Sequence, residues 1–219
     1  MPDSLLILKT VKFVQDTLAD AEGGHDWFHI ERVWKNAQLI AKSEKVDMLV
    51  VELGALLHDI ADAKFYDGDE SIGPKKARAF LASQNIDETV IEHVEKIIKF
   101  ISFKSSLDTK SKKFTSKELE VVQDADRLDA IGAIGIARTF NYGGFKNRVL
   151  YDPSIMPNLK MDKETYKKSK APTINHFYEK LLLLKDKMNT KTGKALAQKR
   201  HDFMKLYLKQ FFAEWEGVL

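Results

Sequence analysis

Residues 54–62 read GALLHDIAD, a run in which small and apolar residues surround three ionisable side chains. Burying such groups costs several kcal/mol unless they are paired or bind a metal. A helical wheel over residues 47–61 is apolar nearly all round, which predicts a central, buried helix. The three polar groups share its small-residue side, and they are His58, Asp59 and Asp62. The rest of the chain must therefore supply partners for them.

Apolar residues recur at helical spacing along most of the chain, and no useful stretch shows the alternation of a strand. This pattern predicts an all-α fold, an irregular helical bundle in one domain of residues 1–219. Residues 143–170 lack periodicity, and long irregular segments of this kind are often functional. The expected helices are 3–18, 26–41, 47–61, 74–83, 87–102, 115–130, 131–141 (closing at the YGG of 142–144), 172–188 and 192–215.

The composition excludes several kinds of protein and site. The 219 residues contain no cysteine, so any metal must be held by histidine and carboxylate groups. No apolar run approaches the roughly 18 residues of a membrane span, and the start has no signal-peptide pattern, which predicts a cytoplasmic chain without a membrane partner. Basic residues gather in 104–117 and 143–170, which favours an anionic ligand or simply two solvated loops. The net charge of +3 does not favour nucleic acid.

Two other predicted helices carry groups that match those of the central helix. His29 lies at the edge of the apolar stripe of 26–41, where an ordinary boundary histidine is the alternative interpretation. In QDADRLDA (123–130) the wheel places Asp126 and Asp129 near the apolar face and points Asp124 away.

Together these helices predict a catalytic metal site. Two imidazoles and two carboxylates suit Mn²⁺, Fe²⁺, Co²⁺ or Zn²⁺, with Mg²⁺ as a further candidate, and leave room for water and substrate. Asp62, one turn beyond Asp59, is placed to take a proton from an attacking water, although a pairing with Lys64 is the alternative. The predicted metal ligands are His29, His58, Asp59 and Asp126.

Four stretches of the chain carry a family resemblance. They are GHDWFHIERV (24–33), LLHDIADAKFYDGDE (56–70), VQDADRLDAIGAIGIARTF (122–140) and YGGFKNRVLYDP (142–153). In combination they resemble the HD superfamily of metal-dependent phosphohydrolases, and most of all the small bacterial HD proteins that include nucleoside triphosphate pyrophosphohydrolases. The resemblance covers about residues 23–153, with the closing helices of 172–215 beyond it.

The resemblance implies an all-α fold and one divalent metal ion per chain, with Mn²⁺ favoured, on the four ligands above. It further implies hydrolysis of phosphoanhydride or phosphoester bonds, commonly in nucleotides, and a homodimer. Basic groups near the site would then bind the substrate phosphates. The substrate-binding candidates are Arg32, Lys64, Lys146 and Arg148, with Lys104 and Arg127 as weaker ones because the wheel turns Arg127 away.

Several residues keep two interpretations. Asp129 is either part of the site or a structural partner of Arg127 or a backbone amide, and His93 is either a structural residue or a ligand of a second metal. His176 and His201 have no acidic neighbours in sequence and are interpreted as structural.

The leading hypothesis is a hydrolase that converts a (deoxy)nucleoside triphosphate to monophosphate and pyrophosphate. The alternatives are an HD-type phosphodiesterase or phosphomonoesterase, a diiron oxidase, and a non-enzymatic module that binds nucleotide or nucleic acid through 143–170.

Overall fold

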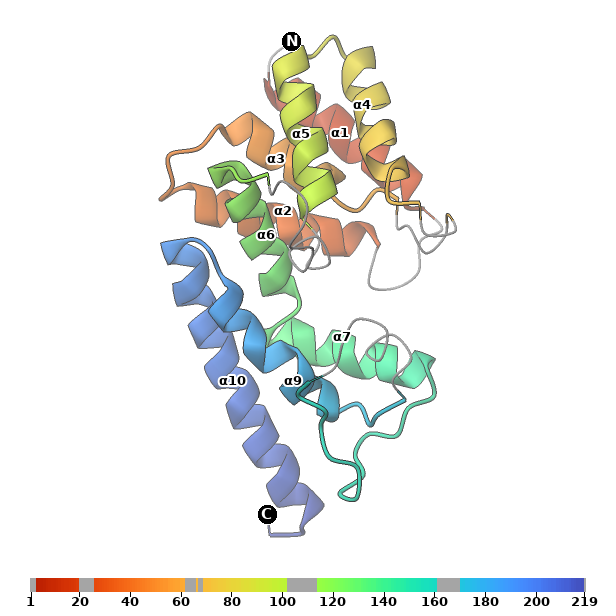
Figure 1. The fold of residues 1–219 in the computed structure, drawn as a ribbon, viewed down its shortest axis with the longest axis vertical. Coiled ribbons are helices and arrows are strands. Elements are labelled where there is room, and N and C mark those ends of the chain that lie inside the picture. The colour runs from red at the N-terminus through yellow and green to blue at the C-terminus, as the bar shows by residue number, and fades with distance from the viewer. Residues whose placement is uncertain are drawn as a thin grey trace. The chain divides into compact units, whose positions relative to one another are not determined.

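The structure is a computed structural model that describes residues 3–19, 26–61, 66, 69–101, 114–160 and 170–218. Over these residues the chain forms helices and no strand, which confirms the predicted all-α fold (Figure 1). Its contacts divide it into two compact units, Met1–Asp126 and Arg127–Leu219, and the single domain stays a prediction. None of the described helices is both long and apolar enough to cross a membrane.

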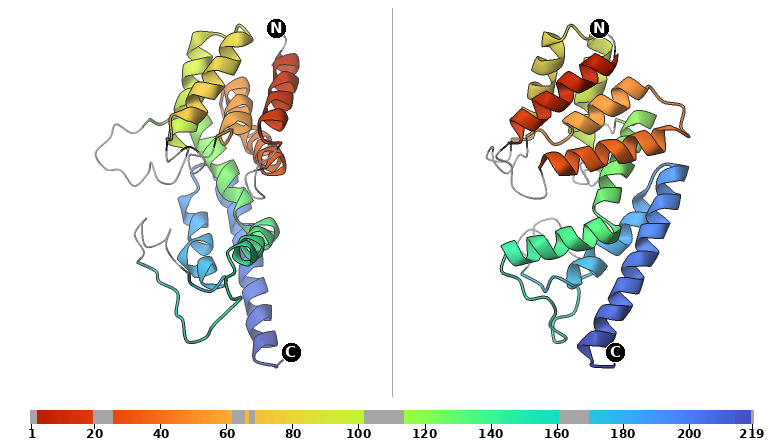
Figure 2. Two further views of the ribbon diagram at one scale, coloured as in Figure 1. Left: turned by 90° about the vertical axis from the view of Figure 1, so that its right-hand side faces the viewer. Right: turned by 180° about the vertical axis from the view of Figure 1, so that it is seen from behind.

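The first unit packs its helices around α3. In chain order these are α1 (Asp3–Thr17), α2 (Trp27–Ala41), α3 (Met48–Leu57), α4 (Ile72–Ser83), α5 (Glu88–Phe100) and most of α6 (Lys117–Asp129). α3 contacts α1, α2 and α5, while α4 and α5 lie side by side as a hairpin (Figure 2). This arrangement makes α3 the centre of the unit.

α3 is buried on all sides, as its wheel predicts. Asp47 begins the helix, because its side chain accepts hydrogen bonds from two backbone N–H groups of the first turn, at 3.0 and 3.2 Å. Every residue from Val50 to Leu57 except Glu52 is buried. The helix ends at Leu57 and not at residue 61, so that His58 is its C-cap. The HD pair therefore lies at the end of the central helix.

The second unit is held together largely by aromatic side chains. Its helices are the remainder of α6, α7 (Gly132–Phe145), α9 (Asn175–Glu179), the 3-10 helix η2 (Leu181–Lys187) and the long α10 (Lys191–Trp215). The rings of Phe140, Phe177 and Tyr207 meet with centroids 5.9 to 6.1 Å apart. These contacts join α7, α9 and α10.

Two more predicted helices differ from those in the structure, besides α3. α7 does not close at YGG but continues to Phe145, and within it Gly143 lets the helix approach Thr173 closely. A Cβ at Gly143 would lie 2.3 Å from Thr173 Oγ1. The predicted helix 172–188 is broken at Lys180, whose φ of −143° and ψ of −57° separate α9 from η2. Residues 146–160 are irregular, as predicted.

Candidate metal centre

α2 places His29 in the interior of the first unit. Asp26 caps the helix, and its side chain accepts a hydrogen bond from the His29 backbone N–H at 2.9 Å. Ile30 and Val33, on the same side of the helix, are fully buried. The His29 side chain is 3% exposed, so the boundary position predicted from the wheel is in fact an interior one.

The end of α3 presents His58 in a defined tautomer. Its Nδ1 lies 2.8 Å from the Ala55 carbonyl oxygen. Because a carbonyl oxygen can only accept, Nδ1 carries the proton and Nε2 keeps its lone pair. A backbone carbonyl is a common orienting partner of metal-binding histidines. The side chain is 5% exposed, so the Nε2 lone pair faces a nearly closed space.

α6 brings Asp126 to both imidazoles. Asp126 Oδ1 lies 3.6 Å from His29 Nε2 and 3.9 Å from His58 Nε2. The two rings meet edge to face with centroids 5.4 Å apart. One potential ligand atom from each residue lies within 4.8 Å of the other two. Two imidazoles and a carboxylate at this spacing fit a borderline divalent cation, and the chain has no cysteine that could add a thiolate.

Burial favours the neutral form of His58. Burial lowers the pKa of His58, and the carboxylates of Asp126 and Asp59 only partly offset that effect. The neighbouring His29 lowers it further. A metal ligand must be unprotonated, so a histidine that is neutral when buried is ready to bind.

The fourth predicted ligand is near this cluster but outside it. Asp59 is half-buried, and its charge acts on His58, yet its carboxylate is not among the atoms within 4.8 Å of one another. Its role as a ligand stays a prediction. The predicted base Asp62 and the predicted phosphate contacts Lys64 and Lys104 lie outside the described residues.

The wheel was wrong about one aspartate of α6. Asp124 is fully buried, whereas Asp126 has a side chain that is 39% exposed. The reason is that α6 is buried on a second side besides that of Val122 and Ala125, since Val121 and Leu128, which share a side of the helix with Asp124, are also fully buried. A wheel with a single apolar face does not describe such a helix.

Asp129 is held by a partner that the sequence did not suggest. Its buried carboxylate accepts a hydrogen bond from Arg138 Nη1 at 2.6 Å. The predicted partner Arg127 donates instead to the Lys187 carbonyl oxygen. The structural interpretation of Asp129 is thereby supported. The signal was present in ARTF, where Arg138 follows Asp129 within the next helix.

Two further predicted site residues of the first unit, Arg32 and His93, are not members of the three-residue cluster. Arg32 is half-buried on α2, one turn beyond His29. His93 contacts Ser116 and Glu118 and is not in the cluster, so among the described residues no second metal group includes it.

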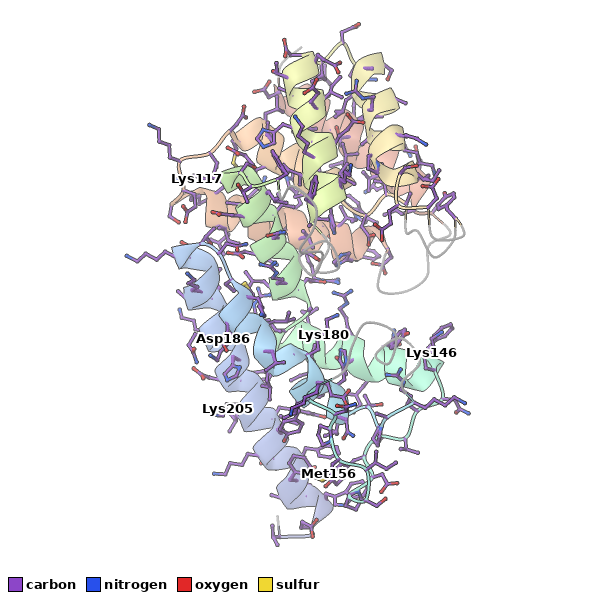
Figure 3. The ribbon with its side chains drawn as sticks, viewed as in Figure 1. Lys117, Lys146, Met156, Lys180, Asp186 and Lys205 are labelled. Carbon is purple, nitrogen blue, oxygen red and sulfur yellow. The ribbon has the colours of Figure 1, made fainter. Side chains whose placement is uncertain are left out.

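Lys146 and Arg148 belong to the second unit. Lys146 is the C-cap of α7, and Figure 3 labels it at the end of that helix. Its ammonium lies 4.9 Å from the ring centroid of Phe145, and the Arg148 guanidinium lies 5.6 Å from that of Tyr142. Arg148 and Lys180 also act on His176, whose pKa burial and these charges lower to about 3. His176 is thus a neutral, buried residue, in agreement with its structural interpretation.

Comparison with known proteins identifies relatives over nearly the whole chain. The HD domain family matches residues 27–131, a range that contains all three members of the cluster. YpgQ of Bacillus subtilis (strain 168) is 37% identical over 213 residues, which cover 94% of this chain and 92% of YpgQ. The crystal structure of an HD-superfamily hydrolase from Bacillus thuringiensis has a TM-score of 0.78 at 42% identity, over 98% of each chain. The structure of Bacillus subtilis YpgQ in complex with ADP has a TM-score of 0.74 at 35% identity, over 98% of this chain and 97% of that one.

Proposed function

Because the chain belongs to the HD domain family, we propose that it is a metal-dependent phosphohydrolase acting on small nucleotides. The convergence of His29, His58 and Asp126 carries this proposal. Two supports come from relatives, since one is described as an HD-superfamily hydrolase and another binds ADP.

The cluster has the donors that such a site needs. Asp59 is the proposed fourth ligand, next to His58 in sequence and close enough for its charge to act there. A bound divalent cation would supply Lewis acidity, which polarises a phosphoryl oxygen and makes water more acidic. Mn²⁺ is the proposed ion. His58, neutral and oriented by Ala55, would bind it without first losing a proton.

The proposed reaction is the hydrolysis of a (deoxy)nucleoside triphosphate to monophosphate and pyrophosphate. A water oxygen bonds to phosphorus, the phosphoanhydride bond to pyrophosphate breaks, and Asp62 accepts the proton of the water. Arg32 and Lys64 are the proposed phosphate contacts of the first unit, with Lys104 as a weaker one. Lys146 and Arg148, which belong to the second unit, stay predictions from the sequence. Guanidinium and ammonium groups neutralise the charge of the transferred group.

A nucleotide panel tests the proposal. Metal-stripped protein is incubated with ribo- and deoxynucleoside mono-, di- and triphosphates, with and without Mn²⁺, Mg²⁺ or Co²⁺, and the products are separated by ion exchange. We expect metal-dependent release of pyrophosphate from triphosphates, and loss of turnover in Asp126→Ala. Asp202→Ala is the control, because it removes an exposed carboxylate of α10.

Each outcome bears on a different part of the proposal. Release of single phosphates would keep the hydrolase and overturn the pyrophosphate product. Equal turnover by wild type and Asp126→Ala would remove the metal cluster from the reaction. No hydrolysis of any nucleotide, with metal bound, would contradict the proposed substrate class.

A further inference from the structure

α3 and α6 touch at their starts, at their middles and at their ends. At the ends, His58 and Asp126 are 3.9 Å apart. In the middle, a Cβ on Gly54 would lie 3.5 Å from Val122 Cγ2. At the starts, Glu118 contacts Asp47. The order of these contacts shows that α3 and α6 both run toward the metal cluster.

The contact at the starts is the only directional one of the three that involves no metal-binding group. Glu118 Oε1 accepts a hydrogen bond from the Asp47 backbone N–H at 3.0 Å. Asp47 is itself the N-cap of α3, so this bond joins α6 to the first residue that organises α3. The Glu118 side chain is 14% exposed, whereas Asp47 is exposed, so the bond lies at the surface of the first unit.

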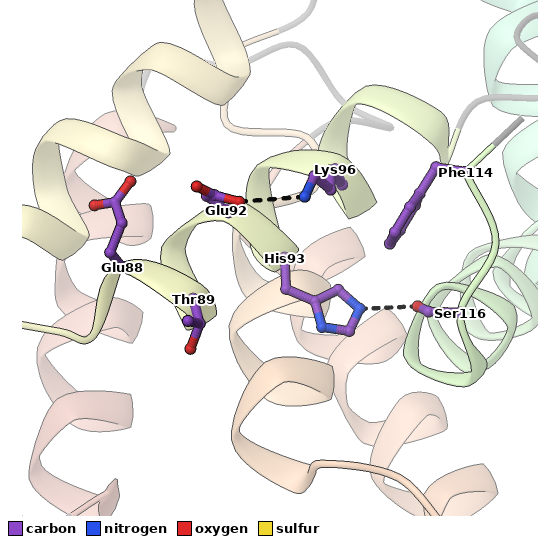
Figure 4. Close-up of a pocket in the computed structure, with 7 residues that line it drawn as sticks. All are labelled: Glu88, Thr89, Glu92, His93, Lys96, Phe114 and Ser116. Atoms are coloured by element: carbon purple, nitrogen blue, oxygen red, sulfur yellow. Dashed lines mark hydrogen bonds and ion pairs between the residues drawn. The ribbon is translucent and has the colours of Figure 1, made fainter. Parts of the chain in front are cut away.

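α5 holds the same carboxylate from the other side. His93 Nε2 lies 2.9 Å from Ser116 Oγ and 3.6 Å from Glu118 Oε2 (Figure 4 draws the first contact). Ser116 Oγ also accepts from the Leu119 backbone N–H at 3.1 Å, as a cap of α6 does. A cavity of about 340 Å³ lies beside His93 and Ser116, and the Phe114 ring that lines it packs edge to face on His93 with centroids 5.6 Å apart. Hydrogen bonds and the ion pair with His93 therefore hold the start of α6 together with the apolar contacts of Phe114 and the buried Leu119.

The middle contact lets the helices approach but does not set their register. Gly54 has no side chain, and its neighbours Ile97 and Val122 are both fully buried apolar residues. Apolar contacts depend on area and not on direction, so they resist separation of two helices more than sliding. Sliding by one residue would move Asp126 by about 1.5 Å along the axis. Metal–ligand distances tolerate only about 0.2 Å.

We propose that Glu118 is a positioning residue of the metal site, because its bond to Asp47 sets the axial register of α6 against α3. The inference rests on the metal site of the proposed function. Glu118 touches neither metal nor substrate and acts through the position of Asp126 relative to His58. The sequence does not link Glu118 to Asp47, since the two residues belong to distant segments of the chain.

The test measures Co²⁺ binding to the metal-stripped full chain by visible absorption, without substrate. Glu118→Ala should weaken Co²⁺ binding about tenfold, the lower end for residues that orient metal ligands. Glu118→Gln keeps an oxygen acceptor for the Asp47 N–H and should bind within about twofold of wild type. Glu118→Asp cannot reach Asp47 without a shift and should resemble Glu118→Ala.

Glu95→Ala is the matched control. Glu95 accepts two hydrogen bonds from Arg78, at 2.8 and 2.6 Å, and so joins α5 to α4, neither of which carries a ligand of the cluster. It should lower the melting temperature and leave Co²⁺ affinity unchanged. Comparing the two variants separates an effect of helix register on Co²⁺ binding from an effect of lower overall stability.

The outcomes distinguish this inference from the proposed function. If Glu118→Ala binds Co²⁺ as wild type does, or if Glu95→Ala weakens binding equally, the inference is wrong and the metal site stands. If Glu118→Ala does not fold, equal affinities of the Gln and Asp variants would overturn the inference. If wild type binds no Co²⁺, the metal site fails and the inference fails with it.

Discussion

Gly143→Ala and Gly144→Ala form a pair whose effects on stability should have opposite signs. Both glycines lie in the last turn and a half of α7. A Cβ at Gly144 meets nothing within 4 Å, whereas one at Gly143 would lie 2.3 Å from Oγ1, 3.0 Å from Cγ2 and 3.2 Å from Cβ of Thr173. Thr173 is 2% exposed, and its backbone N–H donates to the Val149 carbonyl oxygen at 2.9 Å. It has little freedom to move away.

The magnitudes follow from these distances. Replacing glycine by alanine within a helix stabilises it by up to about 1 kcal/mol. Overpacking a buried contact costs about 1 to 3 kcal/mol. Gly144→Ala should therefore raise the free energy of unfolding by up to about 1 kcal/mol. Gly143→Ala should have a free energy of unfolding about 1 to 3 kcal/mol lower than that of Gly144→Ala, because both variants share the helix gain and only Gly143→Ala is overpacked.

Urea unfolding followed by far-UV circular dichroism measures both variants. The double variant Gly143→Ala with Thr173→Ala removes Oγ1 and Cγ2 and should recover most of the loss relative to Thr173→Ala alone. Equal stability of the two alanine variants would refute the close approach of α7 to Thr173.

Three further predictions concern the acidic groups. Asp59→Ala should lose bound Mn²⁺ and turnover, whereas Asp62→Ala should keep Mn²⁺ and lose rate, as measured by metal analysis and kinetics; full activity in both would contradict the mechanism. Asp129→Ala should cost about 3 kcal/mol in thermal unfolding, because it leaves Arg138 without its buried partner, and should keep metal affinity. Burial raises the pKa of Glu118, but hydrogen bonds from backbone N–H groups and the charge of His93 outweigh burial and lower it overall. Ionised Glu118 therefore stabilises the fold at pH values above 4.5, the ordinary pKa of a glutamate. This contribution is lost as the pH falls through the lowered pKa of the folded state, so the melting temperatures of wild type and Glu118→Gln should converge in acid.

Features that depend on one helix at a time were predictable from the sequence. The burial of α3 follows from its apolar wheel, and His29 and Asp126 were found because each lies beside an apolar stripe. The meeting of these residues with His58 was expected from their matching chemistry and from the family resemblance, and the structure brings them together from α2, α6 and the end of α3.

Features that depend on a distant partner were not predictable. Asp124 was misplaced because the wheel assumes one buried face, whereas α6 is enclosed on more than one side. The sequence YGG is typical of a helix end, so the helix was expected to close there. Only the close approach to Thr173, far along the chain, shows why a glycine is needed inside the helix. The partner of Glu118 is likewise a backbone N–H, which no residue pattern reveals.

The three cluster residues all belong to the first unit, at positions 29, 58 and 126. A cation bound to them would act as a cross-link, closing two long loops and adding its binding free energy to the folding of that unit alone. Trp27 and Trp34 lie in that unit and Trp215 in the other. Tryptophan emission from a Trp215→Phe chain would thus follow the metal-dependent half of the molecule as it melts. Metal binding would then be measurable, without any substrate, as a rise in the melting temperature of the first unit.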